Sequence, residues 1–125
     1  MLEIQERFDT SGYEHILAAA GTNTVHITEA LDGSRILGFI AYAYEAERTV
    51  VYGCDDSGDL MLCDGLVRSV MLKSAMKGIE TLTFELTDTE MLTRLVKLHF
   101  LTEGCNVCEN VDGFLNACEH CKNQI

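Results

Sequence analysis

Residues 59–86 constrain the fold more than any other stretch, because two kinds of secondary structure alternate within them. The sequence predicts a short strand over 59–62 and a helix over about 65–77, capped by Asp64 and ended by Gly78. A β-branched and aromatic strand follows over 81–86. A strand, a helix and a strand in one sheet form a parallel pair with a right-handed crossover.

The rest of the chain adds antiparallel strands and two more helices. Strands are expected over 25–30, 36–44 and 49–54, with an Asp32-Gly33 turn between the first two, and a short strand or an irregular lead-in over 2–8. The strand over 36–44 is apolar on both faces. The predicted class is therefore α/β, or α+β, with a mixed sheet of about five or six strands flanked by helices.

Helix signals stand at two further places. Asp9, Thr10 and Ser11 offer N-cap side chains for a helix over about 12–20 that Gly21 ends. Asp88 precedes a helix over about 89–98, and an extended piece over 99–102 follows it. At 125 residues the chain suits one domain, so we expect this domain over 1–104 and a cysteine-rich helix or turn over 105–125 packed on it.

Charge narrows the set of partners. Twenty acidic and nine basic residues give a formal net charge of −11, which repels phosphate backbones and anionic membranes. We therefore expect no nucleic acid and no membrane as partners. The same charge favours a cationic amine as substrate. The alternative interpretation is that the charge only keeps the protein in solution.

The N-terminal residues and the hydropathy predict a cytoplasmic protein. The first ten residues contain Glu3, Glu6 and Asp9 and no signal peptide pattern, and no apolar run approaches the roughly 20 residues that span a bilayer. In a reducing compartment the six cysteines are expected as free thiols or metal ligands. The oligomeric state is left open, a homodimer included.

The order of the elements and several short motifs resemble the GNAT superfamily of N-acetyltransferases. The likeness covers roughly residues 24 to 101 and is carried by the segments ILGFIAYAY, GDLMLCDGLVRSVMLKSAMKGIETLTFE and LVKLHF. Gly33, Gly38-Phe39, Lys77-Gly78-Ile79 and His99-Phe100 match places of that pattern, with His99 where glycine is usual. The resemblance implies a small-molecule amine as substrate and acetyl-CoA as cofactor.

In this superfamily a Gln/Arg-x-x-Gly-x-Gly/Ala loop holds the cofactor diphosphate on its backbone N–H groups, at the start of a helix. The loop is expected near residues 58–63, where this chain has a shortened GDLMLC followed by Asp64. The candidate cofactor-binding residues are therefore the N–H groups of Gly65, Leu66 and Val67 and the side chain of Arg68. Alternatively, Asp64 only caps the helix and Arg68 lies on its solvated face.

No catalytic residue is assigned. Glu45, Glu47 and Asp55 lie near strand ends where the acids of the superfamily sometimes stand, but acids at strand ends are usually only solvated. Tyr42 and Tyr44 share one face of a strand, which suits a cleft or a core contact.

The C-terminal segment CNVCENVDGFLNACEHC contains two C-x-x-C pairs. Cys105, Cys108, Cys118 and Cys121 form a candidate zinc site, because two such pairs supply four thiolates, and His120 is an alternative ligand. The competing interpretations are unliganded thiols on a terminal helix, and disulfides or a redox pair.

Two functions follow from these observations. The first is an acyl-CoA-dependent N-acetyltransferase acting on a small amine, as the resemblance implies; attack by an amine on a thioester depends more on positioning than on a dedicated nucleophile. The second is a non-catalytic binding or interaction module of the same fold, with the four cysteines as a metal-binding tail.

Overall fold

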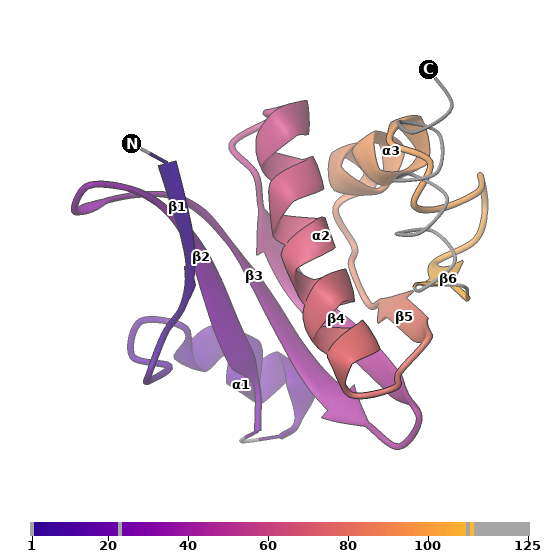
Figure 1. Cartoon of the computed structure of the whole chain (residues 1–125), viewed down its shortest axis with the longest axis horizontal. Helices are drawn as coiled ribbons and strands as arrows, with labels where there is room; N and C mark the ends of the chain where they lie inside the picture. Colours follow the sequence, from indigo (N-terminus) through magenta and orange to yellow (C-terminus); the bar gives the residue numbers. More distant parts are fainter. Residues whose placement is uncertain (1, 23, 110, 112–125) are drawn as a thin grey trace.

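The computed structural model describes residues 2–22, 24–109 and 111 (Figure 1). Six strands form one sheet in which the spatial order, β1-β2-β3-β4-β5-β6, is the order along the chain. The elements are β1 (Leu2–Glu6), α1 (Glu14–Ala20), β2 (His26–Asp32), β3 (Arg35–Glu45), β4 (Arg48–Asp55), α2 (Leu60–Met76), β5 (Thr81–Phe84), α3 (Thr89–Lys97) and β6 (Val107–Cys108). None of the described helices has the length and apolar character needed to cross a membrane.

The sheet is mixed, as the sequence predicts. Strands β1 to β4 pair antiparallel, and the turn after Asp32 places Gly33 at a φ of 64°. Strand β4 then pairs with β5 in parallel, and α2 connects the two. Strand β6 pairs antiparallel with β5, so the start of the cysteine-rich segment extends the same sheet.

The strand predicted over 59–62 is wrong, because these residues lead into and begin α2. The Asp59 carboxylate accepts hydrogen bonds from the N–H groups of Met61 and Leu62 at 2.9 and 3.2 Å, so Asp59, and not Asp64, is the N-cap. This cap outweighs the short apolar run that follows it. The parallel partner of β5 is consequently β4.

The other helix ends agree in part with the prediction. Asp88 caps α3 as expected, and Gly21 ends α1 in the left-handed conformation. The predicted side-chain cap of α1 is wrong: Tyr13 is the N-cap residue and makes no side-chain cap, whereas the Asp9 carboxylate bonds Arg7 and the Ser11 N–H. Residues 99–102 form no strand.

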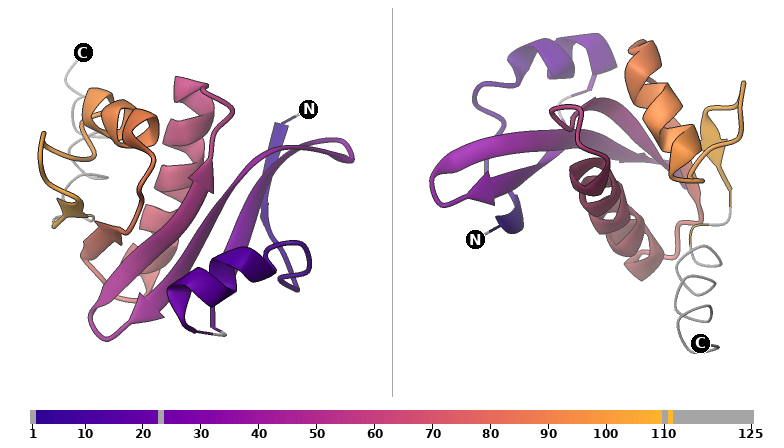
Figure 2. Two further views of the ribbon diagram at one scale, coloured as in Figure 1. Left: turned by 180° about the vertical axis from the view of Figure 1, so that it is seen from behind. Right: turned by 90° about the horizontal axis from the view of Figure 1, so that it is seen from above.

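The two faces of the sheet are covered by different helices, with α1 on one side and α2 on the other (Figure 2). Strand β3 supplies both cores, because Ile40 and Tyr42 pack under α2 whereas Ala41 and Phe39 pack towards α1. Helix α3 lies beside α2 (Figure 1), and its buried residues Met91 and Leu95 join the α2 core. The prediction of a strand apolar on both faces is confirmed.

Candidate functional site

Strands β4 and β5 separate halfway along β4. Their parallel register runs from Arg48 opposite Thr81 to Val51 opposite Phe84, and the last backbone bond joins Glu85 N–H to the Val51 carbonyl at 2.8 Å. Strand β4 continues to Asp55, but β5 ends at Phe84. The second half of β4 thus has no β5 partner in the described part of the chain.

A β-bulge lies at the point where the strands separate. Ala41 of β3 stands opposite Gly53, and the next residue, Tyr42, stands opposite Val51, so Tyr52 is the extra residue in β4. The Tyr52 hydroxyl donates a hydrogen bond to the Glu45 carboxylate, which raises the pKa of Tyr52 to about 12. Glu45 is therefore engaged with Tyr52, while Glu47 lies exposed in the turn before β4.

The backbone N–H groups of the loop between β4 and α2, and of the first turn of α2, donate hydrogen bonds to acidic residues of the same segment. The carboxylates of Asp55, Asp56 and Asp59 and the backbone carbonyls of Asp56 and Asp59 are the acceptors. Six of the seven N–H groups from residue 57 to residue 63 donate to them, at 2.9 to 3.2 Å. The donors are Ser57, Gly58, Asp59, Met61, Leu62 and Cys63.

Asp56 also joins this loop to α3. One oxygen of its carboxylate accepts from Arg94 Nη2 at 2.8 Å and from the Gly58 N–H at 2.9 Å, and the other accepts from Arg94 Nε at 2.6 Å. The Asp56 side chain is 1% exposed and that of Arg94 is 19% exposed. The two N–H···O bonds make this a bidentate ion pair, and the hydrogen bond to Asp56 raises the pKa of Arg94.

These residues do not fit a diphosphate. Anion binding at a helix start needs backbone N–H groups that point at the ligand and a positive local field. Six of the seven N–H groups from residue 57 to residue 63 are already hydrogen-bonded, and three carboxylates lie around them. The loop therefore lacks the donors that the superfamily uses for acyl-CoA.

The predicted cofactor residues lie further along α2 than expected. Since α2 begins at Leu60, Gly65 to Arg68 lie beyond its first turn, where N–H groups bond within the helix, so the premise that they are free is wrong. Leu66 and Val67 are fully buried in the core. Arg68 bonds Asp64 at 2.9 Å and lies over the Phe100 ring, with 5.6 Å between the guanidinium carbon and the ring centroid.

Tyr42 and Tyr44 point to the α2 side of the sheet. The Tyr42 hydroxyl is buried and bonds Thr28 at 3.0 Å and Glu6 at 3.2 Å, whereas Tyr44 packs beside Tyr42 and under Lys77. Burial, followed by the negative charge of Glu6, raises the pKa of Tyr42 to about 12. These tyrosines are core contacts.

Two cysteines lie close to the Asp56 carboxylate. Burial and then the charge of Asp56 raise the pKa of Cys63 to about 12, and its thiol contacts the Met91 sulfur at 3.9 Å. Burial raises the pKa of the Cys54 thiol as well. Both thiols are held in the protonated form, as small apolar core residues.

The candidate zinc ligands are only partly described. Cys105 is exposed and its thiol donates to the Val107 carbonyl at 3.6 Å, whereas Cys108 is buried in β6; Cys118 and Cys121, with His120, lie outside the described residues. Among residues 2–22, 24–109 and 111, no three histidine, cysteine or acidic side chains are placed to hold a metal.

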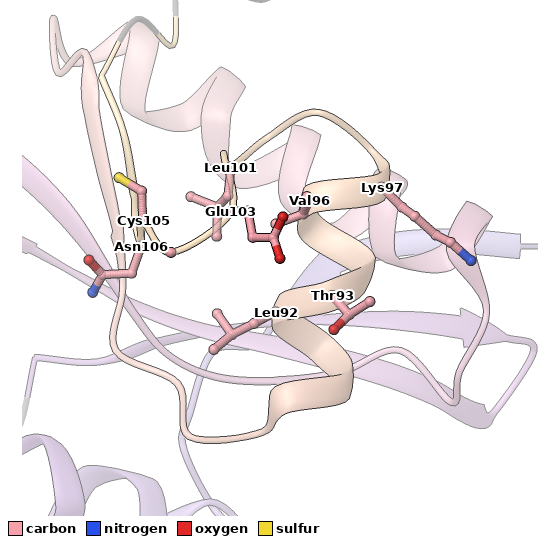
Figure 3. Close-up of a pocket in the computed structure, with 9 residues that line it drawn as sticks. Leu92, Thr93, Val96, Lys97, Leu101, Glu103, Cys105 and Asn106 are labelled. Atoms are coloured by element: carbon pink, nitrogen blue, oxygen red, sulfur yellow. The ribbon is translucent and has the colours of Figure 1, made fainter.

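A cavity of about 590 Å³ lies between α3 and the segment 101–106 (Figure 3). Leu92, Val96 and Leu101 form its apolar wall, and Glu103 and Cys105 project beside them. Its lining residues come from α3 and from the segment before β6, and none of them belongs to the loop before α2.

The mixed sheet, the parallel β4–β5 pair that separates at a bulge, and the crossing helix define an acetyltransferase-like α+β scaffold. No family model and no curated protein matches the sequence. Solved structures do match the fold, and three of them each have a TM-score of 0.60. The ribosomal-protein-S18-alanine N-acetyltransferase from Escherichia coli is 12% identical and aligns over 78% of this chain and 76% of its own.

Two further solved structures are 11% identical to this chain. An IAA acetyltransferase from Bacillus cereus aligns over 78% of this chain and 75% of its own, and a probable acetyltransferase from Staphylococcus epidermidis over 80% and 83%. The chain therefore has a GNAT-like fold, as its motifs suggested.

Sequence reasoning missed the pair of Asp56 and Arg94. The two residues are 38 positions apart, and each looks like an ordinary surface charge in the sequence. The one available signal is the density of acids in DDSGD, which marks the loop as unsuited to an anion.

Proposed function

We propose that this chain is a non-catalytic binding module that keeps the acetyltransferase scaffold without its acyl-CoA site. The observation that carries the proposal is the occupied loop, in which six of seven N–H groups from residue 57 to residue 63 bond the chain itself. A diphosphate has to break these bonds and approach three carboxylates, and both steps oppose binding.

Calorimetric titration with acetyl-CoA and with CoA tests the proposal. We expect no heat of binding and no shift of the melting temperature at millimolar ligand. Saturable binding in the micromolar range contradicts the proposal. Adding 0.5 M salt in that case shows whether the contact is to the phosphates, because a phosphate contact weakens with ionic strength.

An acyl-CoA-dependent N-acetyltransferase acting on a small amine is the second candidate, favoured by the separation of β4 and β5 after Val51 and Phe84. In the superfamily that this fold resembles, such a split admits the pantetheine arm of the cofactor. A net charge of −11 also favours a cationic amine. The rate at which acetyl-CoA releases free thiol can be measured with a panel of small amines. A rate higher than that without protein supports this candidate.

Acetyl-pantetheine, which lacks the diphosphate, separates the two candidates further. If the split alone binds the thioester arm, acetyl-pantetheine binds as tightly as acetyl-CoA, since the loop contributes nothing to either. If neither compound binds, the module is favoured.

A zinc site of Cys105, Cys108, Cys118 and Cys121 remains part of the proposal for the binding module. Two C-x-x-C pairs support it, because four thiolates complete the tetrahedral set that zinc prefers. Elemental analysis of protein purified without added metal is expected to give about one equivalent of zinc, and a Cys108→Ser variant less. If the purified protein contains no zinc, and adding zinc leaves its melting temperature unchanged, unliganded thiols are favoured.

A further inference from the structure

We infer that the Asp56 carboxylate is an internal anion that fills a preformed anion-binding site of the Arg94 guanidinium and the Gly58 N–H. This inference deepens the proposed function, because it names the side chain that keeps an anionic ligand out of the loop. It predicts that removing this carboxylate opens a site for a small carboxylate anion.

The geometry around Asp56 is that of a bound oxyanion. Three donors converge on its two oxygens, at 2.6, 2.8 and 2.9 Å, and they come from two separate elements, α3 and the loop before α2. A planar guanidinium with two parallel N–H groups is the arrangement that proteins use to bind a carboxylate or a phosphate. The donors are therefore in place whether the anion belongs to the chain or to a ligand.

Burial makes this carboxylate different from the other acids of the loop. Asp56 is 1% exposed, whereas Asp55 and Asp59 are exposed and bond only backbone N–H groups. Removing one partner of a buried ion pair leaves the other charge uncompensated. Arg94 without Asp56 therefore loses the carboxylate that pairs with its guanidinium.

Chemical rescue of an Asp56→Ala variant tests the inference. We expect its melting temperature to fall by about 10 °C or more. Sodium formate, which has the size of the missing group, should restore at least about half of this loss at 200 mM, relative to sodium chloride of equal ionic strength. A bulkier carboxylate such as benzoate should restore less, because the site is enclosed.

Asp64→Ala is the matched control. It also removes the carboxylate of an arginine ion pair, the one with Arg68, but that pair is about one-third exposed, with side-chain exposures of 31% and 33%. Formate should therefore act on it no more than chloride does. Equal responses of the two variants, or no formate effect on Asp56→Ala, overturn the inference.

Two further outcomes remain decisive. If Asp56→Ala is unfolded in chloride, recovery of its far-ultraviolet circular dichroism on adding formate supports the inference, and failure to recover overturns it. Wild-type protein that binds acetyl-CoA contradicts the proposed function whatever formate does. Failed rescue without acetyl-CoA binding contradicts the internal anion alone.

Discussion

Gly38 of β3 lies so close to Asp55 of β4 that a Cβ atom added to Gly38 stands 2.3 Å from the Asp55 carbonyl oxygen. That oxygen belongs to the backbone and cannot rotate away. On the neighbouring residue, the Leu37 carbonyl accepts a hydrogen bond from the Ser57 hydroxyl at 2.6 Å. The close approach of these two strands therefore fixes where the acidic loop begins.

A Gly38→Ala substitution is expected to lower the free energy of unfolding by about 2–3 kcal/mol, because the strands have to move apart. Gly65→Ala is the control. Its added Cβ meets only the flexible end of Ile4, at 3.1 Å, and alanine raises helix propensity by about 1 kcal/mol. Urea denaturation of both variants checks the difference, and equal losses contradict this account of Gly38.

The N-cap of α2 can be located by mutation. Asp59→Ala should cost about 1 kcal/mol, because the N–H groups of Met61 and Leu62 lose their acceptor. Asp64→Ala should cost less than about 0.5 kcal/mol, since it removes only a partly exposed i,i+4 ion pair with Arg68. Denaturation midpoints decide the order, and a larger loss at Asp64 would place the cap where the sequence pattern suggested it.

His99 occupies a backbone conformation that suits glycine. Its φ is 69°, immediately after the C-cap of α3, at the place where the superfamily pattern has glycine. Relief of this conformation should make His99→Gly more stable by up to about 1 kcal/mol. Thermal unfolding of this variant tests it, with Thr93→Gly in the middle of α3 as a destabilised control. A destabilised His99→Gly would show that the imidazole makes a contact worth more than the strain.

How much of the structure the sequence predicts depends on how far apart in the chain the interacting residues are. The Asp32-Gly33 turn, the Asp88 cap and the two-faced apolar strand β3 follow from residues close together in the chain, and the structure confirms them. The start of α2 was misplaced because two aspartates, five residues apart, are both good caps. The apolar residues between them fit a strand as well as a helix.

The candidate site was the least predictable part, because its decisive contacts span the chain. The N–H groups of the loop bond local aspartates, which the DDSGD composition hinted at, but the Asp56 carboxylate is buried only because α3 brings Arg94 to it. No local pattern reports such a pairing. Strand β6 was missed for the same reason: a two-residue edge strand is defined by its pairing with β5.

The thiols should differ sharply in reactivity. Burial raises the pKa of Cys54 and Cys63, and only the thiolate attacks an alkylating agent. With iodoacetamide at pH 8, native protein freed of metal with a chelator should be labelled at the exposed Cys105, and at Cys54 and Cys63 only after denaturation. Site-resolved mass spectrometry is the measurement. Equal labelling rates in the native state would mean that the segment containing β4 and α2 opens readily.

The buried hydroxyl of Tyr42 should make stability depend on alkaline pH. Its pKa is raised to about 12 by burial, whereas tyrosine in an unfolded chain titrates near 10. The folded state keeps the proton longer, so the contribution of Tyr42 is complete below about pH 10 and declines as pH rises towards 12.

Tyr42→Phe isolates this effect. At pH 7 the variant should be less stable by about 1 kcal/mol, because the Thr28 hydroxyl loses its partner. The gap between wild type and variant should narrow between pH 10 and pH 11.5, since phenylalanine does not titrate. Urea midpoints across this range measure the gap. A constant gap would show that the hydroxyl keeps its proton equally well in both states, and that burial under α2 does not control its titration.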